Sequence, residues 1–162
     1  MQTALLDLMW IVLHSLVDRD VLIEINLTSN DIILGVKGED HPFPTYLKYG
    51  VPVTLSTDDE GVARINLTHE YLRATQSYNL TYDQIKTMSR NSLTYSFVPG
   101  KRLWRSNKYD GFRAECADQK LYNSALTNQC DRFLRKNPKA ALQWQLERNY
   151  INFERAVAKR IK

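Results

Sequence analysis

The first hydrophobic pattern of the chain has helical spacing. Apolar side chains recur three and four residues apart at Leu5, Leu6, Met9, Leu13, Leu16 and Val17. A charged break, Asp18 to Asp20, follows and predicts the end of this helix. The apolar run is shorter than the roughly 20 residues of a membrane span, and its flanks lack the pattern of a secretory signal. We therefore expect an amino-terminal helix, and neither a transmembrane segment nor a signal peptide.

Two β-rich segments with a helical pattern between them come next. Residues 21–27 alternate with period 2, and residues 51–56 form a second apolar strand. Between them, Asp40-His41-Pro42 is expected to start a short helix that Gly50 ends in the C′ position. The order strand, helix, strand indicates a βαβ unit, because about two dozen residues separate the two strands. The strands of such a unit are parallel and are joined by a right-handed crossover. The pattern predicts α/β architecture.

The remainder of the chain has helical patterns. Thr81 and Gln84 have the spacing of a capping box, which opens a predicted helix that runs to Phe97. Residues 108–136 are predicted to form another helix. The last helix starts at residue 137, and its apolar stripe predicts one buried face made of Leu142, Leu146, Tyr150, Phe153, Val157 and Ile161.

Charge divides the chain into an acidic and a basic part. Residues 1–100 hold 7 Lys and Arg against 12 Asp and Glu, a net charge of −5, whereas residues 101–162 hold 15 against 6, a net charge of +9. A basic part is typical of proteins that bind nucleic acids or membranes. Here the charges are spread singly through helical sequence, with acids among them. We interpret them as solvated helix faces and expect neither a nucleic-acid nor a membrane partner.

The two cysteines, Cys116 and Cys130, are too few for a zinc finger or a disulfide scaffold. Their spacing allows one disulfide between antiparallel helices in an oxidising compartment. It equally allows two inert thiols in a reducing one, and both alternatives stay open.

Three consecutive carboxylates, Asp58, Asp59 and Glu60, follow the second strand. Ligands of α/β folds bind at the carboxyl ends of parallel strands. By strand parity, Asp58 continues the polar face of Thr54, and Asp59 begins the loop. Adjacent carboxylates repel each other unless a cation or a hydrogen-bond donor lies nearby, so a metal site is one interpretation. An acidic surface turn or a helix N-cap is the other.

The three histidines do not form a cluster in the sequence. We expect His14 to pack or to be partly exposed, His41 to organise its loop, and His69 to lie on the surface.

Residues 20–100 resemble the carboxyl-terminal part of the adenosine deaminase family. The matching motifs, in consistent order, are residues 24–30, His41-Pro42, residues 50–59, residues 67–71, residues 90–92 and Ser96-Phe97. Within the family, the sequence is similar to the adenosine-deaminase-related growth-factor branch or its bacterial relatives.

The resemblance implies a TIM-type (β/α)8 barrel that binds one Zn2+ ion, which activates water to attack C6 of adenosine and yields inosine and ammonia. By motif position, Asp58 resembles the family's zinc-ligating aspartate. Asp59 resembles the aspartate that hydrogen-bonds the purine N7. The implied substrate is therefore a purine nucleoside, adenosine.

The departures from the family pattern concern the other site residues. The family's His-x-His pair, its further zinc and water-contacting histidines and its ring-protonating glutamate have no counterpart in the sequence. A full barrel takes about 250 residues, and two strands cannot close one. We therefore expect an α/β carboxyl-terminal fragment of the barrel, its last two strand–helix units, in residues 1–100. A basic helical extension in residues 101–162 is expected to pack on it.

A chain of this kind is expected to be inactive alone and to associate through its exposed strand edges, with the missing barrel segment or with itself. The alternative hypothesis is a non-catalytic remnant or interaction module. A nucleic-acid binder that uses the basic tail is the least favoured interpretation.

Overall fold

The computed structural model describes residues 2–122 and 125–161, and from residue 7 onward their side chains as well. It forms two compact units, Met1–Ser92 and Leu93–Lys162. The division predicted from the sequence falls after residue 100. The assignment of the first part to the last two strand–helix units of a barrel stays a prediction.

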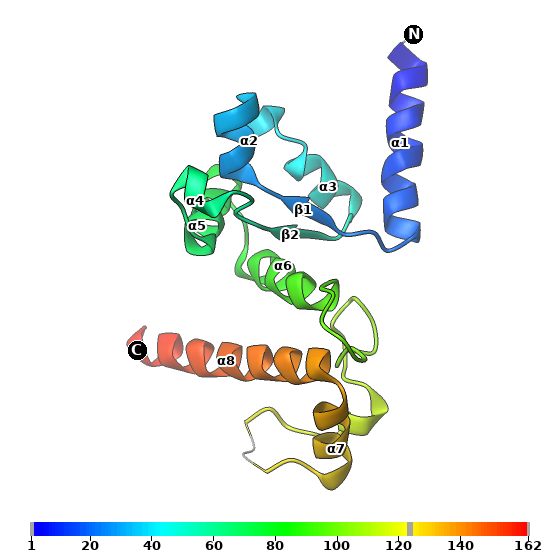
Figure 1. Cartoon of the computed structure of the whole chain (residues 1–162), viewed down its shortest axis with the longest axis vertical. Helices are drawn as coiled ribbons and strands as arrows, with labels where there is room; N and C mark the ends of the chain where they lie inside the picture. Colours follow the sequence, from blue (N-terminus) through cyan, green and yellow to red (C-terminus); the bar gives the residue numbers. More distant parts are fainter. Residues whose placement is uncertain (1, 123–124, 162) are drawn as a thin grey trace. The chain divides into compact units, whose positions relative to one another are not determined.

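The first unit alternates helices with two short strands (Figure 1). Its elements are α1 (Gln2–Asp18), β1 (Ile23–Ile25), α2 (Leu27–Leu34), a 3-10 turn (Gly38–Asp40), α3 (Phe43–Tyr49), β2 (Val53–Leu55), α4 (Glu60–Ala63) and α5 (Leu67–Tyr78). Helix α6 (Tyr82–Thr94) follows, and its last two residues belong to the second unit. The predicted amino-terminal helix is confirmed as α1, although Leu5 and Leu6 lie outside the residues whose side chains are described.

The two strands pair in parallel, as the strand–helix–strand pattern predicts. Ile23 pairs with Val53 and Ile25 with Leu55. Gly50 ends the helix between the strands in the left-handed conformation, at φ 72°, which a glycine adopts without a Cβ clash. The predicted α/β architecture is confirmed for this unit. The described residues form a two-stranded sheet and not a closed barrel.

The strand predicted over residues 21–27 is too long. Leu27 keeps the buried position that the alternation predicts, but its backbone begins α2, where the sequence analysis expects a loop. The polar residues that follow Leu27 explain the switch, because Ser and Asn side chains favour the first turn of a helix over a strand.

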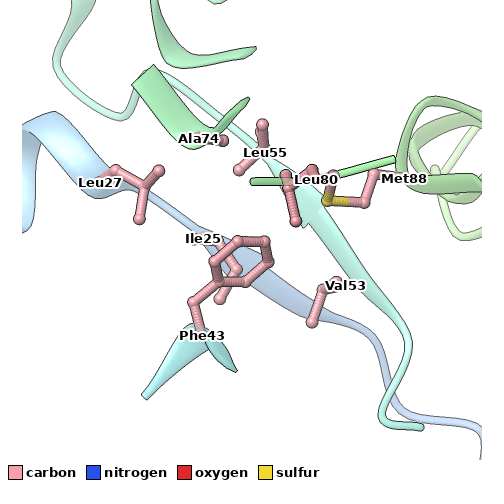
Figure 2. Packing of buried hydrophobic residues seen from close by; sticks show 8 residues of the cluster. All are labelled: Ile25, Leu27, Phe43, Val53, Leu55, Ala74, Leu80 and Met88. Carbon is pink, nitrogen blue, oxygen red and sulfur yellow. The ribbon is translucent and has the colours of Figure 1, made fainter. Parts of the chain in front are cut away.

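The core of the first unit lies around the two strands. Figure 2 shows the buried cluster, which consists of Ile25, Leu27, Phe43, Val53, Leu55, Ala74, Leu80 and Met88. Each large apolar side chain in such a cluster contributes about 1.5–3 kcal/mol by its removal from water. The cluster joins both strands to α3, α5 and α6, so it fixes the strand ends that carry the candidate site.

The capping box at the start of α6 is confirmed. The amide of Gln84 donates to Oγ1 of Thr81 at 3.3 Å, and the amide of Thr81 donates to Oε1 of Gln84 at 2.8 Å. The helix ends at Thr94 rather than at Phe97, which is fully exposed. At this end, Nζ of Lys139 donates to the carbonyl oxygens of Thr94 and Ser96, which supplies the partners that a helix terminus needs.

The second unit contains less helix than predicted. Its elements are a 3-10 turn (Ala114–Cys116), α7 (Asn128–Lys136) and α8 (Pro138–Arg160). The single helix predicted over residues 108–136 is wrong, because α7 begins only at Asn128, where Oγ1 of Thr127 accepts from the amide of Cys130 at 3.3 Å. Residues 106–111 contain Ser, Asn, Asp and Gly, which favour turns.

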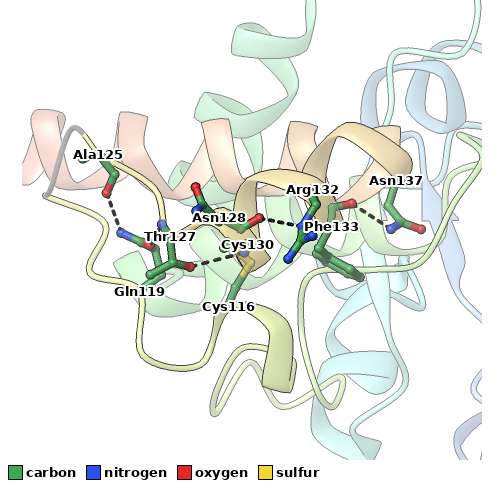
Figure 3. The surroundings of a disulfide bond; sticks show 9 residues. All are labelled: Cys116, Gln119, Ala125, Thr127, Asn128, Cys130, Arg132, Phe133 and Asn137. Carbon is green, nitrogen blue, oxygen red and sulfur yellow. Dashed lines mark hydrogen bonds between the residues drawn. A yellow bond between two sulfur atoms is a disulfide. The ribbon is translucent and has the colours of Figure 1, made fainter.

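Cys116 and Cys130 form a disulfide, which settles the alternative that the spacing leaves open. The bond joins the 3-10 turn to α7 rather than two antiparallel helices, and both cysteines are buried (Figure 3). Gln119 supports the same region, since its side chain accepts from the amide of Thr127 at 2.8 Å and donates to the carbonyl of Ala125 at 3.0 Å. The disulfide therefore lies in the core of the second unit.

The predicted buried stripe of α8 is wrong. Leu142 is 46% exposed and Phe153 is 56% exposed, whereas the buried residues of α8 are Ala140, Gln143, Trp144 and Glu147. Gln143 is buried because its partners satisfy it. Its Oε1 accepts from the amide of Leu103 at 2.7 Å, and its Nε2 donates to Oγ1 of Thr94 at 2.8 Å.

Across the described residues, none of the helices has both the length and the apolar character required to cross a bilayer.

Candidate functional site

The carboxyl ends of β1 and β2 lie side by side and lead into the candidate site. Because the strands are parallel, Asn26 after β1 and Ser56 after β2 leave the same edge of the sheet. The amide of Ser56 donates to the carbonyl of Ile25 at 2.9 Å, which extends the pairing by one more bond. This edge is where α/β folds bind ligands.

Asp58 lies at this edge in a tight turn. Its backbone has φ 52°, a left-handed conformation that Asp adopts more readily than most residues. Its Oδ2 accepts a hydrogen bond of 2.8 Å from Oγ of Ser29. Since β2 ends at Leu55, the turn sets the direction of the Asp58 side chain, and strand parity does not. Its assignment as a metal ligand stays a prediction.

Asp59 occupies the N-cap position of α4. Its carbonyl accepts from the amides of Val62 and Ala63, but its side chain makes no cap hydrogen bond. The Asp59 side chain is exposed, and Glu60 is the first residue of the helix. Asp59 is therefore an N-cap residue by its backbone alone. Its carboxylate does not cap α4 and is available for a ligand.

Ser29 contacts Asp58 at the candidate site, and the sequence pattern does not predict this contact. Ser29 lies in the first turn of α2, directly after β1, and it is buried. The motif over residues 24–30 contains it, but nothing in the motif singles out its hydroxyl. The signal is topological: two parallel strands bring the residues that follow them to one edge.

The histidines lie as expected. His41 is 3% exposed and organises its loop, because its Nδ1 accepts from the amide of Phe43 at 3.0 Å. Burial, and then the positive charge of Arg73, lower the pKa of His41. His69 is exposed, and His14 is half-buried with its ring 3.9 Å from that of Trp10.

The residues that the structure describes do not by themselves fit a zinc ion. Among them, no group of three or more His, Cys, Asp or Glu side chains is gathered to hold a metal. Catalytic zinc sites use three protein ligands and a water molecule. Asp58 offers one ligand, so the described residues alone do not complete a catalytic zinc site.

Comparisons with known proteins find curated adenosine deaminases that are similar to this chain. The chain is 42% identical over 84 residues to an adenosine deaminase of Aliivibrio fischeri, a match that covers 51% of this chain and 25% of the relative. It is 34% identical over 88 residues to an adenosine deaminase of Clostridium acetobutylicum, which covers 54% and 26%. The adenosine deaminase of Salmonella newport is 37% identical over 84 residues, with 51% and 25% covered. No solved structure matches the chain significantly.

The chain thus spans about a quarter of the length of the curated relatives that it matches. The family model for adenosine deaminase matches residues 10–105, which is more than half of the chain. This match extends the resemblance over residues 20–100 at both ends, and it includes both strands, Ser29 and the two aspartates. The chain belongs to the adenosine deaminase family.

Proposed function

We propose that this chain contributes the Asp58 and Asp59 part of a site that hydrolyses adenosine to inosine and ammonia. One observation carries the proposal. Within the stretch that matches the family, the two aspartates follow β2 at the carboxyl edge of a parallel strand pair, and Ser29 from the neighbouring strand's end hydrogen-bonds to Asp58. A carboxylate pair at this edge is suited to bind a cation with one member and to orient a ligand with the other.

The two aspartates have different roles in this proposal. Asp58 supplies one ligand to Zn2+, since its Oδ2 is already oriented by the Ser29 hydroxyl. When bound, the zinc ion lowers the pKa of water and so supplies a nucleophile near neutral pH. Asp59 orients the purine through N7, because its carboxylate is exposed and does not cap α4.

The remaining zinc ligands come from outside the described residues, in this proposal from a polypeptide that supplies the rest of a barrel. Helix α1 supports such an assembly. Leu8, Met9, Trp10, Ile11 and Val12 cover successive positions of this helix and are all exposed. A helix that is apolar on all sides is typical of a buried position. Because the other zinc ligands come from elsewhere in this proposal, the chain alone is expected to be inactive.

A chimera tests this function. The 84 matching residues of the Aliivibrio fischeri deaminase are replaced by the corresponding residues of this chain, and ammonia release from adenosine is measured. We expect an active chimera with bound zinc, and neither activity nor stoichiometric zinc in the 162-residue chain alone. An inactive, folded chimera that binds zinc would contradict the proposal.

The alternative is a non-catalytic interaction module, and the exposed apolar side chains of α1 favour it as well. A folded chimera that binds neither zinc nor adenosine would support this alternative. Retained binding to a barrel partner with no turnover would do the same.

A further inference from the structure

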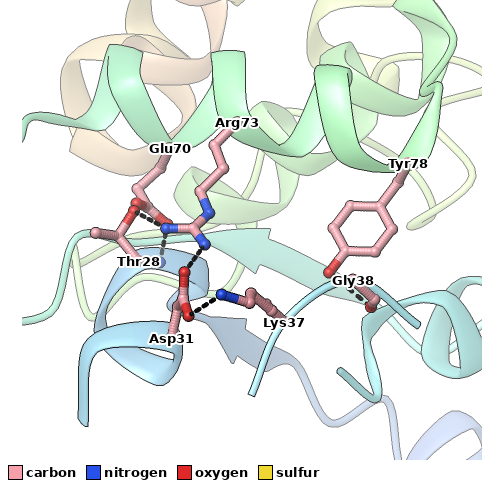
Figure 4. Close-up of polar contacts among 7 residues, drawn as sticks. All are labelled: Thr28, Asp31, Lys37, Gly38, Glu70, Arg73 and Tyr78. Carbon is pink, nitrogen blue, oxygen red and sulfur yellow. Dashed lines mark hydrogen bonds and ion pairs between the residues drawn. The ribbon is translucent and has the colours of Figure 1, made fainter. Parts of the chain in front are cut away.

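The first turn of α2 is capped by a residue from another helix. Asn26 occupies the N-cap position, but its side chain makes no cap hydrogen bond. Instead, Oε2 of Glu70, in α5, accepts from the amide of Thr28 at 3.3 Å (Figure 4). Thr28 is the second residue of α2, so its amide has no carbonyl partner within the helix. Glu70 therefore does for α2 what an N-cap side chain ordinarily does.

The position of Glu70 makes this contact consequential. Glu70 is 0% exposed, and its other oxygen, Oε1, has no hydrogen-bond partner among the described residues. Burial of a carboxylate is costly unless it is compensated. The compensation that the structure offers is the Thr28 amide together with the positive end of the α2 dipole. An apolar side chain would fill the same space without this cost, but it would leave the amide unpaired.

Arg73, one turn further along α5, contacts α2 at two other points, one in its first turn and one at the start of its second. Its guanidinium donates to Oγ1 of Thr28 at 3.2 Å and pairs with Oδ2 of Asp31 at 2.5 Å. Both members of the ion pair are only 24% exposed. Lys37 adds a second cation, 3.4 Å from Asp31. The start of α2 is thus fixed to α5 through both the backbone and the side chain of Thr28.

The residue after Thr28 is Ser29, whose hydroxyl donates to Asp58. A change in the first turn of α2 moves Thr28 and Ser29 together, because both belong to the same helical turn. We propose that Glu70 is a positioning residue, which fixes the first turn of α2 so that the Ser29 hydroxyl orients the Asp58 carboxylate. The effect of Glu70 on catalysis rests on the proposed function. Its effect on the position of Asp58 rests on the hydrogen bonds alone.

Nuclear magnetic resonance of the full chain tests the structural part. Glu70→Gln keeps an acceptor for the Thr28 amide, whereas Glu70→Met has a similar size and no strong acceptor. We expect Glu70→Met to speed hydrogen exchange of the Thr28 amide by about tenfold. It should also move the carboxyl carbon signal of Asp58 to the position found in Ser29→Ala. Glu70→Gln should stay close to the wild type in both readouts.

A core variant distinguishes positioning from a general loss of structure. Leu80→Ala removes part of the core cluster of the first unit. It leaves in place the residues that form the Glu70–Thr28 and Ser29–Asp58 hydrogen bonds. It should lower the free energy of unfolding and leave the Asp58 signal unchanged. If Leu80→Ala moved this signal as far as Glu70→Met does, the inference would be overturned. If Glu70→Met does not fold, Arg73→Met, which removes the hold on Oγ1 of Thr28, is measured against the same control.

The catalytic consequence is measured in the chimera. Glu70→Met should lower kcat about tenfold with a smaller change in KM, and Glu70→Gln should restore most of the loss. An inactive wild-type chimera would refute the proposed function, while the Asp58 signal would still decide the positioning role. An Asp58 signal that is insensitive to Glu70→Met would overturn the positioning role even in an active chimera.

Discussion

Oγ of Ser29 donates a hydrogen bond of 2.8 Å to Oδ2 of Asp58, across 29 positions of the sequence. The bond joins the element after β1 to the turn after β2, and so it ties together the two ends of the parallel strand pair. In α/β folds, ligands bind at this edge, beyond the carboxyl ends of the parallel strands. The bond therefore holds the Asp58 carboxylate in place while its backbone remains in an exposed turn.

Replacement of Ser29 tests how much this bond contributes. Ser29→Ala is expected to lower the free energy of unfolding by about 0.5–1.5 kcal/mol, the net value of a typical side-chain hydrogen bond. Urea unfolding of the full chain measures the effect. Ser77→Ala, which truncates an exposed hydroxyl on α5, is the matched control and should change little. Equal unfolding midpoints for the two variants would show that the Ser29 bond is not formed in solution.

The disulfide is expected to stabilise the second unit selectively. Cys116 and Cys130 close a loop with a sequence separation of 14, and a loop of this length corresponds to about 3 kcal/mol in the chain-entropy model. The double variant Cys116→Ser with Cys130→Ser should therefore speed hydrogen exchange of buried amides such as that of Leu103. The amide of Ile25, in the core of the first unit, is the internal control. Equal effects on both amides would contradict a local role.

The buried imidazole of His41 predicts a pH dependence of stability. Burial, and then Arg73, lower the pKa of His41 below its ordinary value of 6.5. The unfolded chain therefore binds a proton more readily than the folded chain. The stabilisation is complete above pH 6.5 and is lost as the pH falls from 6.5 toward the lower pKa of the folded state.

Urea unfolding across this pH window measures the His41 contribution. His41→Asn, which keeps an acceptor for the amide of Phe43, should flatten the dependence. His69→Gln, at an exposed position, should leave the slope unchanged. A slope that is the same in His41→Asn and in the wild type would assign the titration to other groups.

Helix α8 offers a test of a buried polar side chain against an exposed apolar one. Gln143→Ala should cost about 1–3 kcal/mol, because it leaves the buried amide of Leu103 without its side-chain acceptor. Leu142→Ala, one residue away and 46% exposed, should cost far less. Thermal unfolding followed by circular dichroism measures both. A larger loss for Leu142→Ala would restore the buried face that the apolar stripe predicts.

The same pair of residues shows why the sequence predicts α8 as a helix but not its buried face. Spacing alone assigns Leu142 to the core, because periodicity reports which residues share a face and not which face is covered. Gln143 is buried through partners at Thr94 and Leu103, about 40 or more positions away. No local pattern carries such a contact.

The first unit was more predictable because its signals are local. The capping box of Thr81 and Gln84 and the left-handed Gly50 depend on neighbouring residues, and both are confirmed. The position of Asp58 was less predictable. The strand ends three residues earlier, so a turn with φ 52° determines its direction, and the Ser29 hydroxyl that holds it comes from another strand end.

The central claim is that this chain supplies Asp58 and Asp59 to a deaminase site, and their separate replacement in the chimera tests it most directly. Zinc content and ammonia release from adenosine are measured on Asp58→Ala and Asp59→Ala. Asp58→Ala should lose both zinc and turnover, because it removes a metal ligand. Asp59→Ala should keep its zinc and lose mainly turnover, because misorientation of the purine slows attack. Zinc loss in Asp59→Ala with retention in Asp58→Ala would reverse the two roles, and unchanged turnover in both variants would contradict the claim.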